Sequence, residues 1–140
     1  VTSIGEEAFY CCFELKDVSL PDGVTSIGEE AFYRCESLES IDLPDGLVSI
    51  GNDAFYKCLK LESVTVPDGV TSIDAYAFSD CESLTEVTIP GSVSSIGEDA
   101  FDGCSEDLVL TVERDSYARD YAEENGIEYA YEDADDWLFE

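Results

Sequence analysis

Apolar side chains recur along this chain with a period of 23 residues, in units that start at Val1, Val24, Leu47, Val70 and Val93. The second unit reads VTSIGEEAFYRCESLESIDLPDG. Its apolar positions are Val24, Ile27, Ala31, Phe32, Leu38, Ile41 and Leu43, with Cys35 as a further small candidate for burial. Their spacing follows neither a helical period of 3.6 residues nor strand alternation throughout. The pattern therefore disfavours both a long helix and a plain array of hairpins.

One segment of each unit does alternate as a strand does. In the second unit, Ile41 and Leu43 alternate with Ser40 and Asp42 between residues 38 and 44. A Pro-Asp-Gly turn follows, in which proline presets its own φ and glycine tolerates a positive φ. We expect the remaining residues, 24–32, to form an extended or tightly turned return arm. Each unit thus predicts one short strand, one turn and one return arm.

A single unit of this kind cannot bury its apolar side, but stacked units can, because equivalent residues then form continuous columns. The sequence therefore predicts a solenoid whose parallel strands lie roughly 4.8 Å apart in one sheet. The predicted aromatic column consists of Phe9, Phe32, Phe55, Phe78 and Phe101. The predicted aliphatic column consists of Ile4, Ile27, Ile50, Ile73 and Ile96. We interpret both columns as structural.

The period stops after Val112, and a different pattern follows. Asp115 or Ser116 is a candidate N-cap for a helix that ends at Gly126. The expected packing face of that helix consists of Tyr117, Ala118, Tyr121 and Ala122. A short strand is expected after it, with alternating Ile127, Tyr129 and Tyr131. The predicted organisation is five repeats over 1–114, a helix–strand cap over 115–131 and an acidic tail over 132–140. In that tail, docking of Trp137, Leu138 and Phe139 on the cap is an open alternative.

The motif AFxxCxxLxxVxLPxxVxxIG occurs four times almost unbroken and closely resembles the BspA-type leucine-rich repeat. The resemblance extends from Val1 to about Val112. It implies a right-handed leucine-rich-repeat solenoid with short parallel strands on the concave face, mostly irregular return arms and a C-terminal helix–strand cap. That family occurs largely in bacterial surface proteins and resembles adhesins or protein-binding modules. The resemblance thus implies a noncatalytic protein-binding or adhesion module, at the cell surface or secreted, whose partner is a protein such as a host or extracellular-matrix component.

Charge narrows the choice of partners. The chain has 34 acidic and 6 basic residues and a net charge of −28. Such a chain repels phosphate backbones and anionic lipid surfaces, so nucleic acid and acidic membranes are disfavoured as partners. No apolar run is long enough to insert across a bilayer. Because the chain lacks methionine and starts on a repeat, we interpret it as a fragment or a processed product.

The cysteines occupy one position in every repeat, at Cys12, Cys35, Cys58, Cys81 and Cys104, with Cys11 in addition. Stacking brings such positions within disulfide reach, but a column of free buried thiols is the favoured interpretation. A disulfide is the alternative, with Cys11 as the first candidate for one. The chain has no histidine, which excludes Ser-His-Asp and Cys-His catalysis, and we predict no cofactor. Carboxylates at Asp53, at Asp74 and in the cluster of Glu132, Asp133, Asp135 and Asp136 leave a weak divalent-cation-binding domain as an alternative.

Two surfaces are candidates for binding. The first is the outward stripe of the strands, Asp17, Ser19, Ser40, Asp42, Ser63, Thr65, Glu86 and Thr88, which continues at Val109 and Thr111. It lacks the Trp, Tyr and Arg typical of binding hot spots, so a merely solvated face is its alternative. The second is a return-arm ridge around Tyr10, Tyr33, Tyr56 and Tyr76, for which a packing role is the alternative. Lys57 and Lys60 make the third unit the least acidic of the five. The alternative to a binding function is a structural spacer in a larger surface protein.

Overall fold

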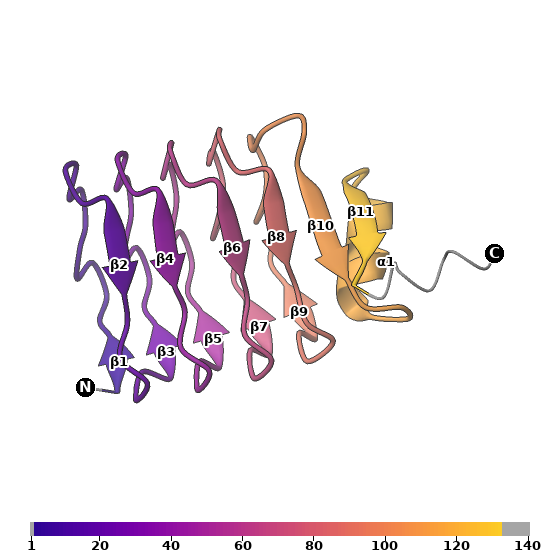
Figure 1. Ribbon diagram of the computed structural model, residues 1–140, viewed down its shortest axis with the longest axis horizontal. Helices are drawn as coiled ribbons and strands as arrows, with labels where there is room; N and C mark the ends of the chain where they lie inside the picture. The colour runs from indigo at the N-terminus through magenta and orange to yellow at the C-terminus, as the bar shows by residue number, and fades with distance from the viewer. Residues whose placement is uncertain (1, 133–140) are drawn as a thin grey trace.

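The computed structural model describes residues 2–132 and shows a solenoid of stacked coils, as the repeat predicts (Figure 1). Each coil carries two short strands. The strands at the predicted positions are β2 (Asp17–Ser19), β4 (Ser40–Asp42), β6 (Ser63–Thr65), β8 (Glu86–Thr88) and β10 (Val109–Val112). The return arms carry β1 (Ser3–Ile4), β3 (Ser26–Ile27), β5 (Ser49–Ile50), β7 (Ser72–Ile73) and β9 (Ser95–Ile96), which the sequence pattern did not predict.

Neighbouring coils pair in parallel and in the register of the repeat. Ser26 pairs with Ser3 and Ile27 with Ile4, and this pairing continues through a five-stranded sheet in the order β1-β3-β5-β7-β9. The longer strands form two separate ladders, β2-β4 and β6-β8-β10, and the second ladder continues into the cap strand β11 (Glu128–Tyr131). The single sheet that the sequence predicted is therefore interrupted between β4 and β6.

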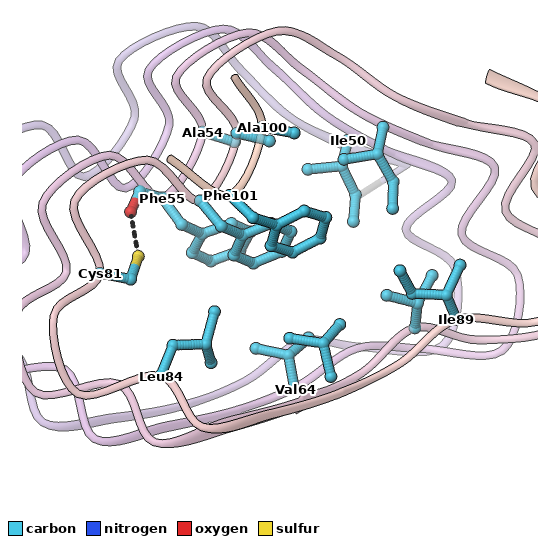
Figure 2. Packing of buried hydrophobic residues seen from close by; sticks show 14 of the residues in the cluster. Ile50, Ala54, Phe55, Val64, Cys81, Leu84, Ile89, Ala100 and Phe101 are labelled. Atoms are coloured by element: carbon cyan, nitrogen blue, oxygen red, sulfur yellow. Dashed lines mark hydrogen bonds between the residues drawn. The ribbon is translucent and has the colours of Figure 1, made fainter. Parts of the chain in front are cut away.

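The core consists of the predicted columns. The rings of successive column phenylalanines are stacked, with centroids 5.1, 5.2, 5.1 and 5.5 Å apart. Figure 2 shows Phe55 and Phe101 in this stack, between Ile50 and Leu84. The ring of Tyr121, from the cap, meets Phe101 edge-on at 6.3 Å. The aromatic column thus continues from the repeats into the cap.

The return arm forms tight turns, because its backbone N–H groups donate alternately to carbonyls of their own coil and to carbonyls of the next coil. In the second coil, the N–H groups of Ala31, Tyr33 and Cys35 close turns within the coil, and those between them donate to the next coil. This arrangement holds Glu30 at φ 58° and Arg34 at φ 56°, in the left-handed region. A non-glycine residue costs about 1–2 kcal/mol there. The hydrogen bonds between coils offset that cost, and equivalent pairs recur in the other repeats.

The cysteine column consists of free thiols, as predicted. Each thiol from Cys35 onward also donates a hydrogen bond to a phenylalanine carbonyl of the preceding coil, which the sequence did not predict. The Sγ–O distances are 3.1 Å for Cys35, 3.3 Å for Cys58, 3.0 Å for Cys81 and 3.2 Å for Cys104. Figure 2 shows the bond from Cys81 to Phe55. Burial raises the pKa of the Cys35 thiol to about 11.

The cap begins with α1 (Tyr117–Glu124) and ends with β11 (Glu128–Tyr131), which pairs in parallel with β10. Ser116 is the N-cap, and its Oγ accepts a hydrogen bond from the Arg119 N–H at 3.1 Å. Ala118 and Ala122 are buried as expected, but Tyr117 is 43% exposed, so its predicted place on the packing face is wrong. The tail residues Trp137, Leu138 and Phe139 lie outside the described residues.

Candidate functional site

The predicted stripe occupies one face of β2, β4, β6 and β8, because each of these strands alternates about a single inward residue. In β4, Ile41 is only 7% exposed, whereas Ser40 and Asp42 are exposed on either side of it. Val64 in β6 and Val87 in β8 are buried in the same way. All eight predicted residues are exposed except Thr88, which is half-buried. Strand alternation therefore brings together the side chains that the sequence singled out.

A groove with a volume of about 280 Å³ lies on this face where the two ladders are separate. Its lining combines side chains of β4 and β6 with residues of the turns that follow them: Ser40, Ile41, Asp42, Leu43, Asp45, Ser63, Thr65 and Pro67. On one side, β4 bonds to β2, where the Glu39 N–H donates to the Lys16 carbonyl at 2.7 Å. On the other, β6 bonds to β8, where the Val66 N–H donates to the Thr88 carbonyl at 2.9 Å. Between residues 2 and 132 the sheets show no pairing of β4 with β6.

The groove offers hydrogen-bond acceptors over an apolar floor. Its walls carry the hydroxyls of Ser63 and Thr65 and the carboxylates of Asp42 and Asp45, and no basic side chain lines it. The Ser40 hydroxyl, also in the lining, donates to the Asp17 carboxylate of the neighbouring strand β2 at 2.7 Å. Carboxylates and hydroxyls accept hydrogen bonds from amide, ammonium or guanidinium groups. The groove is therefore suited to a donor-rich or cationic segment of a partner.

The tyrosine ridge is a second exposed feature, formed by three of the four predicted residues. The ring of Tyr33 stacks on Tyr10 at 4.8 Å and on Tyr56 at 5.0 Å. Tyr10 is 44% exposed, and the other two rings are half-buried. The ammonium of Lys57 lies 5.8 Å from the centre of the Tyr56 ring. Because the rings contact one another face to face, this ridge fits a packing role.

Tyr76, the fourth predicted residue, is exposed on the return arm, and within residues 2–132 its ring is not part of that stack. It occupies the repeat position that Glu30 and Asp53 hold in earlier coils, not the position after the core phenylalanine. Its ring is 37% exposed. The Glu98 carboxylate and partial burial raise the pKa of the Tyr76 hydroxyl.

Carboxylates recur in rows along the return arms. Partial burial, together with the neighbouring Glu7 carboxylate, raises the pKa of Glu30. Within the described part of the chain, no three Asp, Glu or Cys side chains converge as a metal site, and Asp53 and Asp74 form no such group. Of the remaining candidates, Glu132 is the last described residue, and Asp133, Asp135 and Asp136 lie outside that part.

The sequence matches the BspA-type leucine-rich repeat region in six copies, over residues 2–116. The chain belongs to the BspA-type leucine-rich repeat family. Leucine-rich repeats of this type are typically noncatalytic and are consistent with a protein-interaction module. No curated protein matches the chain by sequence.

Solved bacterial structures share this solenoid fold. A leucine-rich repeat protein of T. pallidum is 41% identical with a TM-score of 0.77, and the match covers 79% of this chain and 52% of that one. A leucine-rich repeat protein from Bacteroides ovatus is 27% identical with a TM-score of 0.71, covering 93% of this chain and 39% of that one. The pneumococcal vaccine antigen PcpA shares the fold at 21% identity and a TM-score of 0.69, covering 94% and 42%. This BspA-type chain therefore spans about half the length of these proteins or less.

Within residues 2–132, no helix is long and apolar enough to cross a membrane. The one helix there, α1, ends after eight residues, and its polar positions outnumber its buried alanines.

Proposed function

We propose that this chain is a noncatalytic protein-binding module of a bacterial cell-surface or secreted protein, and that the outward face of β2, β4, β6 and β8 carries the binding. The groove between β4 and β6 is the observation that favours this face over the rest of the surface. It lies within the stripe of exposed hydroxyls and carboxylates, and it provides the concave shape that an otherwise shallow face lacks. The family and the bacterial origin of its solved relatives support the cellular setting.

The partner is a protein that presents backbone N–H groups or basic side chains to the groove. The acidic walls at Asp42 and Asp45 favour such donors, and the net charge of −28 steers basic partners towards the chain. A host or extracellular-matrix protein with an exposed basic segment meets this requirement.

Substitution within the groove tests the proposal. Ser63→Arg with Thr65→Arg fills the groove and cancels the negative charges of Asp42 and Asp45, so binding to immobilised extracellular-matrix proteins is expected to fall at least tenfold. Val48→Arg with Thr71→Arg adds the same charge at exposed return-arm positions and is the matched control. The control is expected to bind as the unsubstituted chain does. Equal losses in both variants, or a loss in neither, would contradict the proposal.

A structural spacer is the second candidate, and the unbroken stacking of the core favours it, because such columns make a rigid rod. Deleting the two whole repeats over 47–92 distinguishes the two functions. A spacer loses reach but keeps its partner binding, whereas the proposed module loses binding along with β6 and β8. Circular dichroism of the shortened chain confirms that it still folds.

A further inference from the structure

A cleft with a volume of about 350 Å³ separates the last repeat from the cap, on a part of the molecule that the strand-face groove does not reach. The fifth coil, which lines this cleft, departs from the repeat. In earlier coils the buried leucine comes three residues after the column cysteine, and the Leu84 N–H closes a turn onto the Cys81 carbonyl. In the fifth coil Asp107 holds that position and is exposed, and the next residue, Leu108, is buried instead. The Leu108 N–H closes its turn onto Ser105, so the turn is shifted by one residue.

The floor of the cleft is apolar. Phe101 and Leu108 are nearly fully buried at its base, and Tyr121 and Ile127 contribute half-buried side chains from the cap. Burial, with the nearby Asp99 charge, raises the pKa of the Tyr121 hydroxyl to about 12. The volume falls at the small end of the roughly 300–1,000 Å³ of ligand pockets, which suits one long side chain or a short segment.

The rim of the cleft is acidic. Asp99, Asp102, Glu106 and Glu128 line it and are all exposed, and no basic side chain lines it. The arginines of the cap are engaged elsewhere. The Arg114 guanidinium lies 4.2 Å from the centre of the Tyr131 ring, and that of Arg119 contacts Asp120 at 3.0 Å.

We propose that this cleft binds a lysine or arginine side chain presented by the protein partner, with the aliphatic stem over the apolar floor and the cationic group at the carboxylate rim. Long cationic side chains bury their stems and keep the charge at the surface, which matches an apolar floor beneath an acidic rim. An acidic or neutral side chain can contact the apolar floor but brings no positive charge to the carboxylate rim. The inference deepens the proposed function by naming the chemistry of a second contact with the partner.

The experiment titrates the full chain with three short peptides in 0.15 M salt, where long-range attraction is screened. The first probe is acetyl-Gly-Lys-Gly-amide. The second replaces lysine with norleucine, which keeps the stem without the charge, and the third uses diaminopropionate, which keeps the charge on a shorter stem. Amide NMR shifts report the location of binding. The lysine peptide is expected to shift the amides of Gly103, Ser105 and Gly126 around the cleft, and to bind at least about threefold more tightly than either analogue.

Glu106→Gln with Glu128→Gln removes two rim charges at exposed positions and is expected to weaken lysine-peptide binding by about threefold or more. Glu14→Gln with Glu39→Gln removes the same charge from exposed positions in the first two repeats and is expected to leave binding unchanged. Three results would each overturn the inference. They are amide shifts spread along the carboxylate rows, equal effects of the two double variants on binding, and equal affinity for the three peptides. Because these probes need no protein partner, such a result leaves the proposed strand-face function untouched. Failure of the Ser63→Arg and Thr65→Arg test, in turn, leaves the cleft result intact.

Discussion

Truncation of Phe55 removes the middle ring of the aromatic column. Phe55 is fully buried, with Phe32 at 5.2 Å on one side and Phe78 at 5.1 Å on the other. The flanking rings cannot close the gap, because backbone bonds such as that from the Phe55 N–H to the Ala77 carbonyl, at 2.7 Å, fix the spacing of the coils. Phe55→Ala therefore loses the transfer free energy of the ring and leaves a cavity. We expect a loss of about 4 kcal/mol in the free energy of unfolding, within the usual 3–5 kcal/mol for this substitution.

Equilibrium unfolding in urea measures this loss from the shift of the midpoint at constant slope. Tyr56→Ala is the matched control, because Tyr56 neighbours Phe55 in the same coil but is half-buried on the outer ridge, where it stacks on Tyr33. Its expected cost is about 1 kcal/mol. If Phe55→Ala cost no more than Tyr56→Ala, the column would not be the main stabilising element, and the argument from stacking would be refuted.

Three further predictions concern the return arms and the thiols. Lys57 has φ 57°, where glycine avoids the cost of about 1–2 kcal/mol that a side chain brings and a β-branched residue fits worst. Lys57→Gly is therefore expected to be more stable than Lys57→Val by at least about 1–2 kcal/mol in urea unfolding, and equal stabilities of these two variants would refute the left-handed assignment. Burial raises the pKa of Glu30, so the folded protein holds the Glu30 proton more tightly than the unfolded chain does. This adds a stabilising free energy that is fully present below the pKa of Glu30 in the unfolded chain and is lost as the pH rises through its pKa in the folded protein. The melting temperature should therefore rise as the pH falls from 7 towards 5, and less so in Glu30→Gln; a fall in both proteins would contradict this. Cys58 is fully buried, so iodoacetamide should modify its thiol only after the protein unfolds, and mass spectrometry detects that modification. If Cys58 in the folded protein reacted as fast as in the unfolded chain, the core would not be closed.

Much of the fold could be predicted because a fixed period directly identifies which side chains stack. Phe32, Phe55 and Phe78 recur at one position, so their burial follows from the stacking of equivalent residues. The second sheet could not be predicted in this way. Its strands are two residues long, as at Ser26–Ile27, and two residues show no alternation that distinguishes a strand from an extended loop.

The candidate site could be predicted in part for the same reason. The stripe follows from alternation about Ile41, Val64 and Val87. The groove depends instead on whether two adjacent strands form a ladder, and the side chains of β4 and β6 resemble those of their paired neighbours. For the cleft beside the cap, one signal was present in the sequence: Asp107 stands where the other repeats have leucine. Its consequence, a turn shifted to Leu108, depends on backbone hydrogen bonding that a single substitution does not reveal.

The central claim, that the strand face carries the binding, is tested most directly by amide hydrogen exchange with and without the partner that the matrix-protein assay identifies. Binding at the groove predicts added protection in β4 and β6 and in the turns after them, because these segments line it. The return-arm strands β3, β5 and β7 should exchange at unchanged rates. Protection confined to the return arms, with β4 and β6 unaffected, would contradict the account.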